Sequence, residues 1–212
     1  MSTAAAPAYG DPETRRRILD AAWALLEERG TGIRVADVAK RAGVSRQGLY
    51  LHFGDRVGLF VAVADHIDVS FGRDRLRTHV FGAPSGAESL RRWVETMSWY
   101  TAKIDSVSRI LELAAESDEA LAAAWKDRMI GRRGHVRRIV DRIATEGRLA
   151  DGWTPESATD LAFAVTLPGP WRVFTSVLRW SAERYSGEVT AMLERTLLGS
   201  VGSERPPAGA AT

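Results

Sequence analysis

The sequence predicts an all-α protein of about nine helices, and three observations support this fold class. Apolar residues recur at helical spacing in most segments between residues 11 and 202. Strand-like alternation is missing, and no Asn-Gly or Asp-Gly dipeptide stands between β-branched runs. Glycine, proline and helix-capping residues separate the periodic segments, where helices begin and end.

Composition restricts the function classes. The 212 residues are 45% hydrophobic and 26% charged, which is enough to bury a core. The absence of cysteine excludes disulfides, thiolate metal sites and cysteine catalysis, and it fits a reducing cytoplasm. No signal peptide or membrane-spanning stretch is evident, so we expect a cytoplasmic protein without a membrane partner. The chain has 29 basic and 27 acidic residues, so its net charge is close to zero. Any nucleic-acid binding must therefore come from a local basic patch.

The first predicted helix has clear ends. Asp11 can cap it, Pro12 suits its first position, and Gly30 stops it. A shorter helix follows from about Arg34 to Ala42 and ends at Gly43.

A third short helix is expected after this turn. Ser45 can cap it, while Val44 and Leu49 stand at the two positions of a hydrophobic staple. This helix ends near residues 51–53, and Asp55 can cap the next one.

The later helices are longer. One carries Leu90 to Ile104 on a single face, and Leu111 and Leu113 are assigned to another. A long helix is predicted from Asp118 to Gly147. Thr154 and Pro155 begin the next, Pro168 to Pro170 break it, and Ser181 to Leu198 form the last.

The helices joined at Ala42 to Ser45 predict a helix-turn-helix. Ser45 presents a hydroxyl and a helix N-terminus to phosphate. Arg46 can pair with guanine or phosphate, and Gln47 can bond an adenine edge. Gly48 permits a close approach of the backbone to DNA. The alternative is that these side chains form an ordinary solvated surface.

The run from Val38 to Phe60, VAKRAGVSRQGLYLHFGDRVGLF, resembles the signature of the tetracycline-repressor (TetR) family. That signature has the form I-A-x-x-A-G-V-S-x-x-x-L-Y-x-H-F-x-x-K-x-x-L. The resemblance implies a dimeric, all-helical transcription regulator, in most cases a repressor. It further implies a variable C-terminal domain that binds a small-molecule inducer and forms the dimer.

The resemblance also assigns roles by position. Together with the side-chain chemistry described above, the resemblance predicts that the following residues contact DNA: Arg34, Ser45, Arg46, Gln47, Gly48, Tyr50, His52 and Arg56. Arg56 stands where the family usually has lysine. Arg34-Val35 replaces a threonine that often caps the second helix, so we expect Thr31 or solvent to cap it instead.

This scheme divides the chain. We predict a disordered tail at 1–10, a DNA-binding domain with the helix-turn-helix at 11–57, a C-terminal ligand-binding and dimerisation domain at 58–202, and a second tail at 203–212. One short recognition helix reads few base pairs, so a homodimer on a pseudo-palindromic operator is expected.

Two further sets of residues are predicted in the C-terminal domain. A pocket for a small apolar or aromatic effector is expected from Trp93, Met97, Tyr100, Trp125, Met129, Phe163 and Trp171. A dimer interface is expected from Phe174, Val177, Leu178, Val189, Met192, Leu193 and Leu197. The alternative for the second set is that it covers the core of its own subunit.

Other function classes have less support. The four histidines form no Glu-x-x-His or His-Glu-x-x-His pair, and no Walker loop is present, so we expect no enzyme activity, metal or cofactor. An architectural DNA binder without a ligand is a second rival. The roughly 140 residues after the helix-turn-helix argue against it.

Overall fold

The computed structural model describes residues 10–71 and 75–199, and these residues are almost entirely helical. The elements are α1 (Pro12–Arg29), η1 (Gly30–Gly32), α2 (Val35–Ala42), α3 (Arg46–Phe53), α4 (Arg56–Phe71), η2 (Arg75–Val80), α5 (Gly86–Ala115), α6 (Glu119–Thr145), α7 (Pro155–Val165), α8 (Pro168–Arg172), η3 (Val173–Val177) and α9 (Ala182–Leu197). Within the described residues an isolated bridge between Leu149 and Leu198 is the only β pairing. The predicted all-α class is confirmed.

The helices form two compact units. One unit reaches Arg77 and adds Trp99–Gly131, and the other consists of Thr78–Ser98 and the residues from Arg132 onward. Helices α5 and α6 therefore contribute to both units. The division at residues 57 and 58 stays a prediction, and apart from Gly10 the two predicted tails lie outside the described residues.

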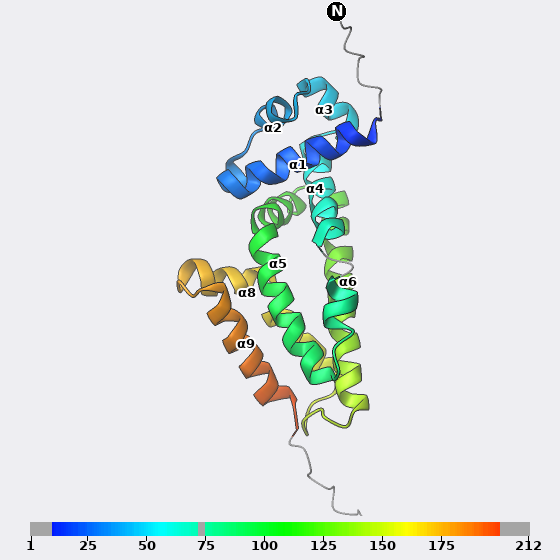
Figure 1. The fold of residues 1–212 in the computed structure, drawn as a ribbon, viewed down its shortest axis with the longest axis vertical. Helices are drawn as coiled ribbons and strands as arrows, with labels where there is room; N and C mark the ends of the chain where they lie inside the picture. Colours follow the sequence, from blue (N-terminus) through cyan, green and yellow to red (C-terminus); the bar gives the residue numbers. More distant parts are fainter. Residues whose placement is uncertain (1–9, 72–74, 200–212) are drawn as a thin grey trace, which may run out of the picture. The chain divides into compact units, whose positions relative to one another are not determined.

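In the first unit, α2 and α3 lie side by side, and α1 packs against α2 (Figure 1). The predicted ends of α1 are confirmed. The Asp11 carboxylate accepts hydrogen bonds from the backbone N–H groups of Glu13 and Thr14, and Gly30 follows the helix with a φ of 64°. Buried residues of α1, among them Ile18, Ala22 and Leu25, form the core of this unit with residues of α2, α3 and α4.

One predicted break is wrong. Leu111 and Leu113 do not belong to a separate helix, because α5 runs unbroken from Gly86 to Ala115. No glycine or proline interrupts it after Gly86, and Ile104, Val107 and Leu111 continue its buried stripe. Spacing alone did not show that the two apolar patterns belong to one helix.

In the second unit, helices begin at the residues that the sequence predicts near the C-terminus. Thr154 and Ser157 form a capping box at the start of α7, with Pro155 in the first turn. Pro168 to Pro170 lie at the start of α8, after a break between the helices at Thr166 and Leu167. The Ser181 side chain caps α9 by accepting from the N–H of Arg184. None of the described helices is both long and apolar enough to cross a membrane.

Candidate nucleic-acid interface

The turn between α2 and α3 has the geometry that the sequence predicts. Gly43 ends α2 in the left-handed region, at φ 66° and ψ 34°, where a side chain would be strained. Ser45 then caps α3, and its Oγ accepts a hydrogen bond of 2.9 Å from the N–H of Gly48. Because Oγ uses a lone pair in this bond, the Ser45 hydroxyl proton remains available to an external acceptor.

One side of α3 holds it to the domain. Leu49 is its single fully buried residue, while Tyr50 and Phe53 are half-buried against the same core. Val44, before the helix, also packs on that core. The two residues of the predicted staple therefore both contact the interior, and the rest of α3 faces outward.

The outward side of α3 carries polar groups. Ser45, Arg46 and Gln47 are exposed, as is Arg56 at the start of α4. The Arg56 guanidinium lies 5.4 Å from the centroid of the Phe60 ring. Tyr50 and His52 are half-buried, so each presents only part of its ring to solvent.

Gly48 has a reason within the chain as well. A Cβ added there would lie 3.2 Å from the Ser45 Oγ that caps the helix. The absent side chain thus leaves room for the cap. Its predicted role in allowing the backbone to approach DNA remains a prediction.

At the start of α2, the sequence leaves Thr31 or solvent open as the cap. Arg34 occupies the cap position, and neither it nor Thr31 supplies a capping side chain. Arg34 is highly exposed, and its Nε lies 3.4 Å from Asp37, whose negative charge in the first turn suits the helix dipole. A charged contact from Arg34 to phosphate would compete with this weak surface pair.

Four lysine and arginine residues lie between residues 40 and 56, and one of them is paired within the chain. Arg41 donates to the Glu28 carboxylate of α1 at 2.7 Å. This hydrogen bond raises the pKa of Arg41 and lowers the pKa of Glu28. Arg41 therefore forms an ion pair that joins α2 to α1. The other three cations between residues 40 and 56 are Lys40, Arg46 and Arg56.

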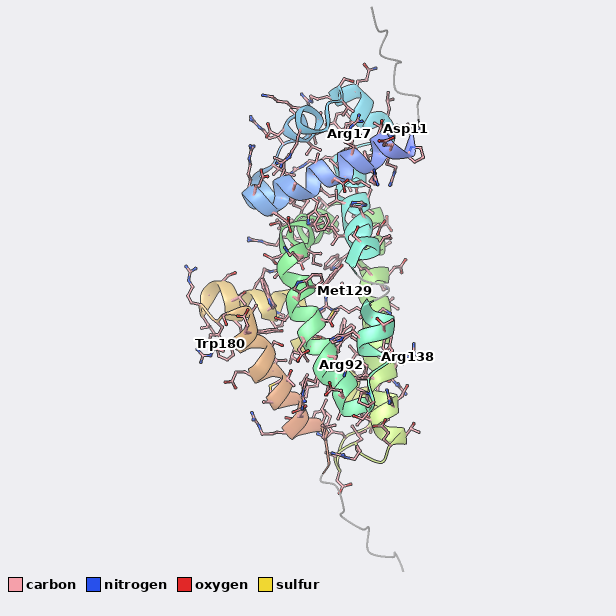
Figure 2. The ribbon with its side chains drawn as sticks, in the orientation of Figure 1. Asp11, Arg17, Arg92, Met129, Arg138 and Trp180 are labelled. Carbon is pink, nitrogen blue, oxygen red and sulfur yellow. The ribbon has the colours of Figure 1, made fainter. Side chains whose placement is uncertain are left out.

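Two arginines of α1 support the site and were missed. The Arg17 Nε donates to the backbone carbonyl of Ala42 at 2.9 Å, at the turn before α3 (Figure 2). Arg15 lies 5.1 Å from the centroid of the Phe53 ring, at the other end of α3. These partners are far apart in sequence, so no local pattern pointed to them.

A surface hollow of about 540 Å³ lies beside the end of α3. It is lined by Arg15, His52, Phe53, Asp55, Val57, Gly58, Val61, Ala62, Asp65, Asp118 and Leu121. Asp55, one of the lining residues, caps α4 as the sequence predicts. Its carboxylate accepts a hydrogen bond of 2.7 Å from the N–H of Gly58. His52, which is predicted to contact DNA, is thus one of the residues that line this hollow.

The seven residues predicted for an effector pocket fall in different units. Trp93, Met97, Phe163 and Trp171 belong to the second unit, and Tyr100, Trp125 and Met129 to the first. Trp93 and Met97 are buried, and the others are half-buried. Trp125 lines a cavity of about 10 Å³, which is too small for an effector. A pocket shared by all seven stays a prediction.

Polar groups lie inside the second unit. The buried Arg132 donates to the carbonyl of Thr166, and its guanidinium is 6.0 Å from the Trp93 ring centroid. The Tyr185 hydroxyl donates to the carbonyl of Val165 at 2.6 Å. Burial raises the pKa of Tyr185 to about 12. The end of α7 is therefore held by two side chains from other helices.

The predicted dimer residues divide into two groups. Val189, Leu193 and Leu197 are buried within the single chain. Their assignment to a dimer surface stays a prediction. Val177 and Leu178 are exposed by 70% and 53%. Phe174 is half-buried against Trp180 and Tyr185, and Met192 is also half-buried.

Comparison with known proteins gives a family match for one part of the chain. Residues 18–63, which span most of α1 through the first half of α4, match the model of bacterial regulatory proteins of the tetR family. No curated protein matches the sequence.

Solved structures share the fold over most of the chain. A TetR-family regulator from Rhodococcus sp. has a TM-score of 0.70 at 23% identity, over 87% of this chain and 98% of the other. A protein from Saccharomonospora viridis, described as a transcriptional regulator and solved with choline, has a TM-score of 0.76 at 19% identity, over 89% and 99%. FadR from Bacillus subtilis, solved with stearoyl-CoA, has a TM-score of 0.68 at 17% identity, over 85% and 98%.

Proposed function

We propose that the chain is a member of the tetR family of bacterial regulatory proteins, whose model matches residues 18–63, and that it is a homodimeric, sequence-specific transcriptional repressor. It binds a pseudo-palindromic operator in double-stranded DNA and is released by a small apolar or aromatic effector. The observation that carries this proposal is α3, a capped helix with one buried anchor and an outward row of Ser45, Arg46 and Gln47.

The chemistry of that row suits a major groove. The Ser45 hydroxyl proton and the N-terminus of α3 can both donate to a phosphate oxygen. Arg46 can pair with guanine or phosphate, and Gln47 can donate to and accept from an adenine edge. Arg34, Tyr50, His52 and Arg56 surround α3 as further contacts, and Gly48 brings the backbone close.

Two copies are needed because α3 spans only eight residues. Half-sites one helical turn apart, about 34 Å, give a dimer enough base contacts for a specific site. Val177, Leu178, Phe174 and Met192 belong to the proposed dimer surface. Val177 and Leu178 are exposed in the single chain, as an apolar interface requires.

An effector in the second part of the chain would act by favouring a state with the wrong spacing of the two α3 helices. Trp93, Met97, Tyr100, Trp125, Met129, Phe163 and Trp171 are the proposed pocket residues. Structures of the same fold that hold choline or stearoyl-CoA support ligand binding in principle, without identifying this ligand. The proposed location is the cytoplasm.

An enzyme is the alternative class. In the parts of the chain that the structure describes, no group of three or more His, Asp or Glu residues could hold a metal ion. We propose a regulator without a cofactor on the strength of the helix-turn-helix and the family match, and not of this absence.

Selection of bound DNA from a random pool tests the proposal. A repressor of this kind enriches one inverted repeat, with half-site centres about one helical turn apart. A chemically broad set of small molecules should then include one that raises the melting temperature and releases this DNA. Failure to enrich any sequence contradicts DNA recognition, while a set without such a molecule contradicts only the effector.

A further inference from the structure

Leu51 is an apolar side chain on the outward side of α3 that neither the staple nor the predicted DNA contacts include. It is 48% exposed, whereas Leu49, two residues earlier in the same helix, is 0% exposed. Residues two apart in an α-helix point about 200° apart. Leu49 and Leu51 therefore have opposite surroundings, one in the core and one in solvent.

The position of Leu51, more than its exposure, makes it informative. Single exposed apolar residues are common and need no explanation by themselves. In the described residues, the other large apolar side chains of this kind are Val69, Leu113, Ile130, Val173, Val177 and Leu178, and all of them lie outside α3. Leu51 stands four residues after the exposed Gln47, so the two share one face of the helix.

That shared face carries both a polar amide and an apolar side chain. A glutamine amide reads the N6 and N7 edge of adenine, and an apolar side chain contacts the C5-methyl group of thymine. Four residues along a helix span about 6 Å, and successive base pairs are about 3.4 Å apart. A methyl group contacted by Leu51 would therefore lie within about two base pairs of the edge read by Gln47.

We propose that Leu51 is a specificity-determining residue that packs on a thymine methyl group in each half-site of the operator. The assignment rests on the proposed function, because it needs α3 to lie in the major groove. It adds a base preference: a thymine near the base pair that Gln47 contacts.

Methyl deletion in the DNA tests this directly. Each thymine of the selected half-site is replaced in turn by deoxyuridine, which lacks the C5-methyl group and keeps the same pairing with adenine. Wild-type protein should bind about fourfold more weakly at one such position for each half-site changed, as expected for losing one buried methyl group. The Leu51→Ala variant should bind thymine and deoxyuridine DNA equally at that position.

Leu113→Ala is the matched control, since Leu113 is 63% exposed in α5 and undergoes the same chemical change. It should keep the full thymine preference. The proposal is overturned if no thymine position is sensitive in the wild type, or if Leu51→Ala retains the sensitivity. A pool selection that yields no sequence overturns the proposed function first, so the two failures are distinguishable.

Discussion

The two helices α3 and α9 differ in how many of their residues are buried in the single chain. In α3 only Leu49 is fully buried, and the remaining length presents groups that can meet a partner. In α9 five residues are buried, Tyr185, Val189, Thr190, Leu193 and Leu197, so the helix serves mainly its own unit. Few buried residues therefore hold α3 to its unit, whereas most of the apolar stripe of α9 is buried.

This difference explains which predictions held. The turn chemistry of Gly43 and Ser45 is local, and the structure confirms both roles. The apolar stripe of α9 was visible too, but a stripe does not say which surface covers it. Three of its residues, Val189, Leu193 and Leu197, are predicted for a dimer interface and are already buried in the single chain.

Long-range contacts account for most of what the sequence did not reveal. The bond from Arg17 to the Ala42 carbonyl joins residues 25 positions apart. The ion pair between Arg41 and Glu28 likewise depends on how α1 and α2 pack, and it pairs one of the four cations between residues 40 and 56. Fold class, caps and the turn were predictable because each depends on neighbours within four residues.

The largest expected effect on stability is in α9. Leu193→Ala removes a fully buried side chain and should lower the free energy of unfolding by about 3 kcal/mol. Urea denaturation measures the change. Val177→Ala, at a position 70% exposed, should change stability by less than about 0.5 kcal/mol. Equal losses in the two variants would show that the burial contrast is wrong.

Charge on the exposed patch should affect association instead. The double change Val177→Glu with Leu178→Glu places like charges opposite each other in a symmetric interface and should weaken dimerisation by about a hundredfold. Analytical ultracentrifugation measures the dissociation constant, and circular dichroism checks that each variant is folded. An unchanged dimer would move the interface elsewhere.

Tyr185 predicts a pH dependence for the second unit. Its pKa rises to about 12 in the folded chain from a usual value of 10.0, so its contribution to stability is complete below pH 10 and is lost as the pH rises to about 12. Stability should fall by about 1.4 kcal/mol per pH unit more in the wild type than in Tyr185→Phe across this window. Parallel curves for the two proteins, from unfolding at pH 9 to 12, would contradict the burial of this phenol.

A pair of cap deletions compares the two helices most evenly. Ser45→Ala and Ser181→Ala each remove an N-cap hydroxyl, and each should cost about 1 kcal/mol in unfolding experiments. Ser45→Ala alone should also weaken operator binding, because that hydroxyl faces DNA in the proposed complex. If both variants lost DNA affinity equally, the loss would follow from stability rather than from a contact.

The central claim is that α3 recognises DNA, and operator affinity of the double variant Arg46→Ala with Tyr50→Ala tests it most directly. Binding to the selected operator is measured by fluorescence anisotropy beside a control, Arg109→Ala, which removes an exposed arginine of α5. We expect a loss of about a hundredfold or more in the double variant with dimerisation intact, and no change in the control. Wild-type affinity in the double variant would contradict DNA recognition by α3.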